Sequence, residues 1–306
     1  MISRERLIDL LAMSRFANLP TVWSNGFLGV LIGWELQQHP HPICPLCLIL
    51  IGVALSFLYL GGCFLNDVHD LEFDQKTRPD RPIPAGRWSR KTIFIFAIAL
   101  MGSGLALCFI VSAASGLFAA GIIICILAYT KWHKRTAWSF IFMAGARALI
   151  YPTAAYSLYG WDQFENHFAN WFSIFIVLSI GLGGYILGIS ITAKSESAPT
   201  PPTPKEQAIP VACLCAPAIF ISSPLLLVGS GKAAAPLLLF FIVLIFSVRS
   251  VRANHDVGRF VSRTLAAIPL VDCLVVIPLA PHPAIWFLCP LLAIMALVLQ
   301  RIAPAT

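Results

Sequence analysis

The sequence contains few charged residues, and this scarcity excludes an ordinary soluble domain. Asp, Glu, Lys and Arg make up 11% of the 306 residues, whereas a soluble domain carries about 25%. Apolar residues make up 58% of the chain, and the mean hydropathy is +0.82. We also expect no cleavable signal peptide, because residues 1–15 are polar and lead into an apolar stretch without a small-residue cleavage site. The composition therefore predicts an integral membrane protein.

Apolar windows of about twenty residues recur along the chain, and each is long enough to cross a bilayer as a helix. They predict an all-α, polytopic integral membrane bundle of nine to ten transmembrane helices, forming a single domain over residues 1–306. Within this domain, the Pro-rich segment 196–207 is expected to be a flexible cytoplasmic loop. The windows lie at 17–36, 43–65, 92–112, 115–131, 137–158, 170–190, 208–229, 233–249, 264–280 and 284–300.

The distribution of positive charge indicates how these helices are oriented. The net charge is +7, but the basic residues fall in alternate connecting segments, and the predicted outer segments carry only Lys232. The outer segment 159–169 is acidic, through Asp162 and Glu165. The positive-inside rule is thus satisfied with both termini in the cytoplasm. We therefore expect a multi-pass protein of a bacterial inner membrane, with membrane lipid rather than nucleic acid as its surroundings.

A charged segment interrupts the apolar sequence after residue 65, and it begins with three regularly spaced acids. At about 100° per residue, Asp67, Asp70 and Asp74 lie within about 60° of one another around a helix that continues past the membrane. Such a face repels itself unless a cation lies on it. Oxygen ligands at this spacing suit Mg²⁺, which proteins commonly hold with one or two carboxylates plus substrate phosphates. The sequence thus predicts a cytoplasmic metal and diphosphate site.

The residues that follow the acids support the same interpretation. Arg78 and Arg81 offer planar guanidinium groups for phosphate oxygens. The prolines between 79 and 84 exclude a helix, and Gly86 permits a sharp turn. The alternative is a solvated loop whose positive charges only orient the protein. Three acids on one helical face make the first interpretation the stronger one.

These residues resemble a known family. Asn66-Asp67-Val68-His69-Asp70 with Asp74, followed by Arg78-Pro79-Asp80-Arg81-Pro82-Ile83-Pro84 and Gly86, is similar to the first aspartate-rich motif and following loop of the UbiA superfamily of intramembrane prenyltransferases. The resemblance implies an all-helical membrane fold, Mg²⁺, and transfer of a prenyl group from a polyprenyl diphosphate to an aromatic or lipophilic acceptor. It implies that Asp67, Asp70 and Asp74 are catalytic and hold the metal, and that Asn66 contributes to substrate binding.

Other segments extend the resemblance. Arg15 and Asn18, one turn apart, resemble the family's basic residue and Asn that face the active cavity, although packing through small residues is an equal alternative. The segment 128–136 resembles the family's tyrosine and lysine-arginine segment, which implies that Lys131 and Arg135 bind the diphosphate. The alternative is that these bases only hold this end in the cytoplasm. Arg147 lies deep in a predicted span, so we expect it to face a polar cavity and to pair with a carboxylate or a substrate anion.

The second aspartate-rich motif of the family is missing here. Residues 188–193 read Gly-Ile-Ser-Ile-Thr-Ala where acids are expected, so only one well-held metal is predicted. Lys194, with the other cations, could supply fixed positive charge in its place. This departure resembles the EboC-type members of the superfamily. It leaves as an alternative a non-catalytic protein that binds or exports a prenylated or lipophilic metabolite.

Three further features have open interpretations. His39 and His41 with Cys44 and Cys47 could bind a metal, the two thiols could form a redox pair, or they could be incidental. Aromatic residues of the fifth predicted span, including Tyr151, could line an apolar tunnel or could only pack against neighbouring helices. Asp272 is an intramembrane acid that we expect to pair with a neighbouring helix.

Overall fold

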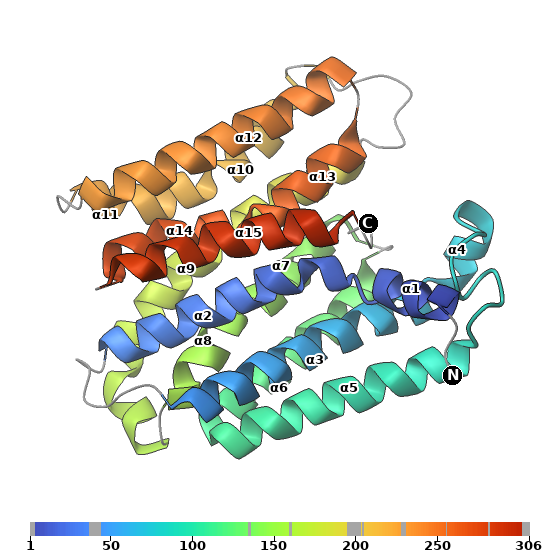
Figure 1. Cartoon of the computed structure of the whole chain (residues 1–306), viewed down its shortest axis with the longest axis horizontal. Helices are drawn as coiled ribbons and strands as arrows, with labels where there is room; N and C mark the ends of the chain where they lie inside the picture. Colours follow the sequence, from blue (N-terminus) through green and yellow to red (C-terminus); the bar gives the residue numbers. More distant parts are fainter. Residues whose placement is uncertain are drawn as a thin grey trace.

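The computed structural model describes residues 4–36, 44–133, 136–158, 161–194, 203, 205–227, 231–254, 256–280 and 282–301, and throughout these residues every regular element is a helix (Figure 1). Short 3-10 turns join several of them, and a π-helical segment at Ala218–Ser222 joins α10 to α11. The α-helices are α1 (Arg4–Met13), α2 (Leu19–Leu36), α3 (Pro45–His69), α4 (Leu71–Thr77), α5 (Arg90–Val111), α6 (Ala113–Trp132), α7 (Phe140–Ala148), α8 (Ile150–Ala155), α9 (Trp161–Lys194), α10 (Ala208–Leu214), α11 (Ser223–Leu227), α12 (Ala234–Asn254), α13 (Val257–Ala266), α14 (Ile268–Leu279) and α15 (Leu288–Leu299).

Length and apolar composition identify the helices that can cross a membrane. Six helical stretches among the described residues meet both conditions, and two shorter apolar ones accompany them. The predicted all-helical membrane fold is therefore confirmed, while the number of nine to ten spans stays a prediction. The six stretches are Pro45–His69, Arg90–Val111, Ala113–Trp132, Ser173–Ala193, Gly231–Val251 and Val257–Leu279.

Several predicted boundaries differ from the structure, and two of the differences have a clear reason in the sequence. The predicted span 137–158 is divided into α7 and α8, and α7 ends at Ala148, four residues before Pro152. The division has a physical reason, because a proline ring conflicts with the carbonyl group four residues earlier and lacks the amide proton that would bond to it. The predicted outer segment 159–169 is helical from residue 161 onward, as part of α9. No Gly or Pro occurs between residues 161 and 180, so nothing interrupts that helix.

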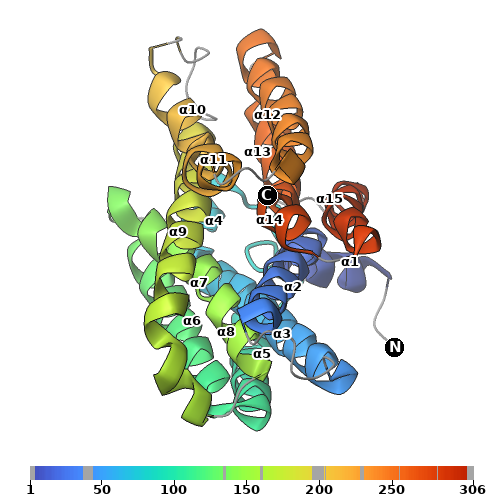
Figure 2. The same ribbon diagram turned by 90° about the vertical axis from the view of Figure 1, so that its left-hand side faces the viewer.

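The helices lie side by side along the long axis, and α2 lies between α3 and α15 (Figures 1 and 2). It also contacts α8 closely, because Gly29 and Gly33 present no side chain there. A Cβ atom on Gly33 would lie 2.8 Å from the carbonyl oxygen of Ala155. Small residues four apart allow membrane helices to approach in this way. The approach brings the polar residues of α2 against those of α7 and α8.

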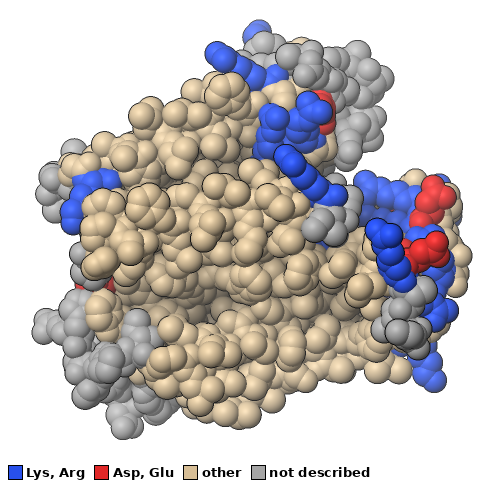
Figure 3. All heavy atoms as spheres, in the orientation of Figure 1, with Lys and Arg blue, Asp and Glu red and all other residues tan. Residues whose placement is uncertain are grey.

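One end of the bundle is strongly charged. Lys and Arg gather over α1, α4 and the loop before α5, and again near the start of α13, whereas uncharged surface covers the length of the helices on this face (Figure 3). Large exposed side chains such as Phe94, Ile98 and Ile110 form part of that apolar surface. An apolar belt with a charged end is typical of a protein embedded in lipid. The acids of the predicted site lie at this charged end.

Candidate functional site

The three acids of the predicted site point into the protein. Asp67, Asp70 and Asp74 have 9%, 7% and 3% of their surface exposed. Helix α3 ends at His69 and α4 begins at Leu71, but backbone hydrogen bonds continue across the junction. The amide of Asp70 donates to the carbonyl of residue 66 at 2.9 Å, and the amide of Asp74 donates to the carbonyl of Asp70 at 2.8 Å. The carboxylates therefore keep a nearly helical spacing and are buried together.

Arginine side chains offset the mutual repulsion of these carboxylates. Nη1 of Arg81 lies 2.8 Å from Oδ2 of Asp74 and 3.8 Å from Oδ1 of Asp67. Nη2 of Arg15 lies 3.6 Å from the same Oδ1 atom of Asp67. A buried carboxylate needs such partners, because removing a charge from water without compensation is costly. The predicted need for cations on this face is thus met by two arginines, one from the loop after α4 and one from the joint between α1 and α2.

Asp70 has a different partner, which the sequence had not indicated. Nε2 of His133 lies 3.1 Å from Oδ1 of Asp70. Nδ1 of His133 lies 3.2 Å from the carbonyl oxygens of Tyr129 and Thr130, and its ring stacks on Tyr129 with 5.0 Å between centroids. Because carbonyl oxygens only accept, Nδ1 carries a proton. Nε2 thus lies within ion-pair distance of the Asp70 carboxylate, and the pair is an ion pair when the ring is protonated at both nitrogens.

The loop that supplies Arg81 is fixed at both sides. Ile83 is buried against α3 and α5, and Gly86 has a φ of +73°, the left-handed conformation that favours glycine. Arg87 then donates two hydrogen bonds to Asp9 of α1, at 2.9 and 3.0 Å. The hydrogen bonds with Asp9 raise the pKa of Arg87. The loop is therefore anchored to the membrane helices on one side and to the N-terminal helix on the other.

Arg15 occupies a strained joint. It is the only residue other than glycine with a positive φ in the described part of the chain, at φ 47° and ψ 44°. A left-handed conformation costs a non-glycine residue about 1–2 kcal/mol, and such strain often marks functional sites. The joint ends α1 and lets the Arg15 side chain reach Asp67. Asn18, one turn later, is 3% exposed, and its Oδ1 accepts no hydrogen bond from any described residue.

Arg147 lies deeper in the bundle, as expected, and bonds to neutral groups. It donates from Nη1 to Oδ1 of Asn25 at 3.0 Å and from Nη2 to Oγ1 of Thr21 at 2.8 Å. Its guanidinium carbon lies 5.6 Å from the centroid of the Tyr59 ring, which is a cation–π distance. The predicted carboxylate partner is present only indirectly, since Asn25 also bonds to Asp272.

Asp272 is the centre of a buried polar network that joins α2, α8 and α14. It is 1% exposed and accepts hydrogen bonds from Ser24 at 2.6 Å, from Tyr151 at 2.7 Å and from Asn25 at 2.8 and 3.0 Å. All of these partners donate to the carboxyl group of Asp272, which accepts from three side chains at once. The expected pairing with neighbouring helices is therefore present, and Arg147 is attached to it through Asn25.

The remaining cations selected from the sequence lie elsewhere. Arg78 is exposed, and Lys131 is exposed with its Nζ 5.5 Å from the ring centroid of Trp132. Arg135 lies outside the described residues, as does the side chain of Lys194. The diphosphate-binding roles of these four residues thus stay predictions, while the structure brings Arg15 and Arg81 to the acids.

The other sequence features have mixed outcomes. Cys44 and Cys47 are free thiols, and a hydrogen bond with Cys47 lowers the pKa of Cys44, whereas His39 and His41 lie outside the described residues. Most of segment 196–207 also lies outside them, apart from Thr203 and a turn at 205–207 that leads into α10. Where the second aspartate motif is missing, the hydroxyls bond to carbonyls of their own helix, at 2.8 Å for Ser190 and 3.0 Å for Thr192.

The acid cluster has the donor chemistry for a metal, although its side chains alone do not form a closed site. Within the described residues, no three Asp, Glu, His or Cys side chains converge on one metal position. The buried Oδ1 atoms of Asn66 and Asp67, however, accept no hydrogen bond from the part of the chain that the structure describes. The amide of Asn66 donates to Oδ2 of Asp70 at 3.1 Å. Hard oxygen atoms without donors fit Mg²⁺, which usually completes its shell with water and substrate phosphate.

Comparison with known proteins identifies the family. The sequence pattern of the UbiA prenyltransferase family matches residues 22–265. A digeranylgeranylglyceryl phosphate synthase of Methanococcoides burtonii is 30% identical over 129 residues, which cover 41% of this chain and 46% of that protein. The chain thus spans about half the length of this curated relative. The family match does not separate the EboC-type members from the others.

Solved structures have the same fold. The apo structure of a UbiA homolog from Aeropyrum pernix K1 aligns with a TM-score of 0.65 and 15% identity, covering 86% of this chain and 96% of that one. A structure described as giving structural and mechanistic insights into digeranylgeranylglyceryl phosphate synthase in membranes aligns with a TM-score of 0.58 and 18% identity. It covers 90% of this chain and 97% of the other. At these identities the likeness concerns the fold.

Proposed function

The chain belongs to the UbiA prenyltransferase family, and we propose that it transfers a prenyl group from a polyprenyl diphosphate to an aromatic or lipophilic acceptor in the membrane. One observation carries this proposal. Three carboxylates are buried together at the charged end of a membrane bundle, beside Arg15 and Arg81. Acids placed only to orient the chain would instead lie in water, where ionised groups are most stable.

We propose that Asp67, Asp70 and Asp74 hold the metal, with Asn66 beside them, and that the metal is Mg²⁺. When bound, Mg²⁺ would neutralise the diphosphate oxygens as the allylic C–O bond ionises. Arg81 holds Asp74 and lies within ion-pair distance of Asp67, so it is placed to support the leaving diphosphate. Arg15 approaches Asp67 from the joint between α1 and α2, and it can donate to the leaving diphosphate as well.

The cationic residues also indicate how the missing second motif is tolerated. The stretch 188–193 of α9 contains no acid, so a second metal has no carboxylate there. We propose that the guanidinium groups of Arg15 and Arg81 supply part of the charge that a second metal would provide. Preorganised cations stabilise developing negative charge well in a site from which water is excluded. Arg147 is proposed to extend this positive region toward the membrane interior.

The orientation follows from the same charges. We propose that the end that carries α1, α4 and the acid cluster faces the cytoplasm, since Lys and Arg gather there (Figure 3). The bacterial inner membrane stays the prediction for the host membrane. The donor would then bind with its diphosphate at the cytoplasmic end and its prenyl chain among the apolar helices.

A transfer assay tests the proposal. Purified protein in lipid nanodiscs is incubated with radiolabelled polyprenyl diphosphates of several lengths, Mg²⁺ and a panel of aromatic and lipid acceptors. Asp67→Asn should reduce product formation by at least about 100-fold, a loss typical of removing one preorganised charge stabiliser. Glu72→Gln is the matched control, because Glu72 is an exposed carboxylate on α4 and should leave activity unchanged. Donor binding with no product for any acceptor, and without dependence on Mg²⁺, would instead indicate a carrier.

A further inference from the structure

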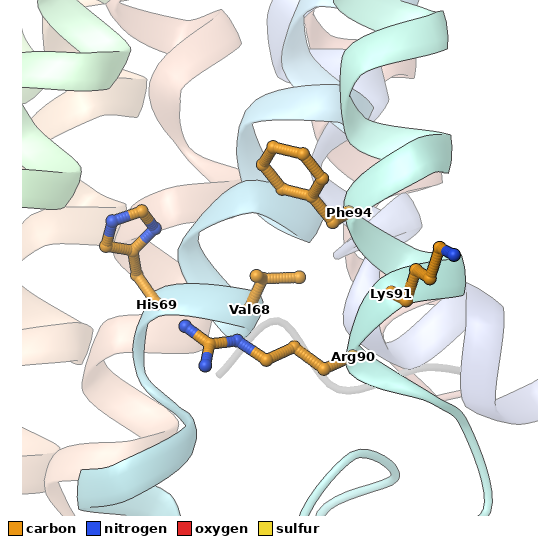
Figure 4. Close-up of a pocket in the computed structure, with 5 residues that line it drawn as sticks. All are labelled: Val68, His69, Arg90, Lys91 and Phe94. Atoms are coloured by element: carbon orange, nitrogen blue, oxygen red, sulfur yellow. The ribbon is translucent and has the colours of Figure 1, made fainter.

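A pocket lies on the outer side of the helix that carries the acids. It has a volume of about 370 Å³ and is lined by Val68, His69, Arg90, Lys91 and Phe94. Figure 4 shows the Arg90 side chain extending from the start of α5 toward the end of α3, with Val68 and Phe94 above it and His69 beyond. The floor is thus apolar. Arg90 extends across it, whereas the Lys91 side chain points away from Arg90 (Figure 4). None of these residues belongs to the acid cluster.

The cations of this pocket have no protein anion to neutralise them. Among the described residues, no carboxylate lies within ion-pair distance of Arg90 or Lys91, and both side chains are exposed. The start of α5 does not account for them, because Ser89 already caps it by accepting from the amide of Thr92 at 3.0 Å. The positive charge is therefore available to a ligand from outside.

The position of the pocket indicates the ligand. The membrane-crossing stretch of α3 ends at His69, and that of α5 begins at Arg90, so the pocket lies at the level where both helices leave the bilayer. Below it along α5, Phe94, Ile95 and Ile98 are 44%, 52% and 48% exposed. A ligand seated here meets positive charge at the surface and an apolar helix face beneath. That combination matches a phospholipid, whose phosphate and acyl chains lie at these two depths.

We propose that this pocket is a binding site for an anionic phospholipid, with Arg90 as the main contact of the phosphate, Lys91 adding positive charge beside it, and the acyl chains along Phe94 and Ile98. Guanidinium and ammonium groups both bind phosphate strongly, and His69 supplies a further hydrogen-bond donor. The site is distinct from the acid cluster, since Val68 and His69 line it whereas Asn66 and Asp67 are buried on the cluster side. It does not depend on the proposed transfer activity.

Native mass spectrometry of the full chain tests the site. The purified protein is titrated in mild detergent with phosphatidylglycerol or with phosphatidylcholine of the same acyl chains. Arg90→Gln with Lys91→Gln should weaken phosphatidylglycerol binding by roughly 30-fold, because each basic residue near the surface contributes roughly 5-fold. Phosphatidylcholine binding should not change. The conservative pair Arg90→Lys with Lys91→Arg keeps the charge and should keep binding near the wild-type level.

The control removes the same charge elsewhere. Lys76→Gln with Arg301→Gln neutralises two exposed cations that do not line the pocket. If this pair weakens phosphatidylglycerol binding as much as the pocket pair does, the effect is general surface charge and the site is refuted. Unchanged binding in the pocket pair also refutes it. Competition by millimolar inorganic phosphate alone would show a free-phosphate site and overturn the assignment to lipid, whereas resistance to it supports the assignment.

Discussion

The buried network around Asp272 leads to a quantitative prediction for the stability of the bundle. Asp272→Ala removes the shared acceptor of Ser24, Tyr151 and Asn25. The Tyr151 hydroxyl then loses its acceptor, Ser24 keeps only the weak acceptor Sγ of Cys289, and Asn25 keeps only Oη of Tyr151. Each unsatisfied buried donor costs roughly 1–3 kcal/mol in soluble proteins, and hydrogen bonds between membrane helices average about 0.6 kcal/mol. We therefore expect the free energy of unfolding to fall by about 2–5 kcal/mol.

The measurement is unfolding in mixed detergent. The protein is titrated from a mild detergent into sodium dodecyl sulfate, and loss of tertiary structure is followed by tryptophan fluorescence. Asp272→Asn is the informative companion, because its carbonyl oxygen can still accept from Tyr151 while its amide faces the Ser24 hydroxyl, which can turn to accept. The free energy of unfolding should fall about half as much for Asp272→Asn as for Asp272→Ala. Met or Leu at 272 should resemble Ala, since the donors would again lose their shared acceptor.

Two results would refute the reasoning. If Asp272→Ala unfolds at the wild-type midpoint, the hydrogen bonds to Asp272 contribute nothing to holding α2, α8 and α14 together. If Asp272→Asn lowers the free energy of unfolding as much as Asp272→Ala does, then charge rather than hydrogen-bond acceptance stabilises the network. In that case Arg147→Met, which removes the only cation attached to the network through described residues, should produce the same loss.

Three further predictions concern the charged end. His133→Phe keeps the stacking on Tyr129 but removes the imidazole nitrogen that lies 3.1 Å from Asp70, so the Mg²⁺ concentration for half-maximal activity should fall; an unchanged Mg²⁺ titration would contradict the competition between His133 and the metal. Gly86→Ala places a Cβ on a left-handed residue and should cost about 1 kcal/mol, seen as faster proteolysis of the loop around it, and equal cleavage rates would argue against a strained turn. Arg87→Ala breaks an exposed ion pair, so the unfolding free energy should change by at most about 1 kcal/mol at low salt; a larger loss that persists in high salt would show that the pair is more than a surface contact.

The parts of the site that could be predicted from the sequence are those defined by local spacing. Asp67, Asp70 and Asp74 lie within one or two helical turns, so helical geometry alone predicted that they lie together. Arg81 follows them closely, and the prolines around it predicted a loop. Gly86 likewise has the left-handed conformation that a turn glycine allows.

The parts that could not be predicted depend on contacts between distant segments. His133 lies in a basic run that resembles a membrane anchor, and only the packing of α6 against α3 brings it to Asp70. Ser24 and Asp272 are separated by 248 residues, so neither could identify the other. The break before Pro152 did have a sequence signal, because the proline itself predicts where α7 must end.

The N-terminal helix is connected to the acid cluster at two points. One is the strained joint at Arg15, and the other is the ion pair between Asp9 and Arg87. Asp9 of α1 accepts two hydrogen bonds from Arg87 in the loop of Arg81, and Arg15 lies in the joint that follows α1, so the positions of both guanidinium groups depend on the first fifteen residues. Trimming the chain to its membrane-crossing part would therefore remove one of the two arginines that face the carboxylates. A protein shortened in this way would test a different site, even if every aspartate were intact.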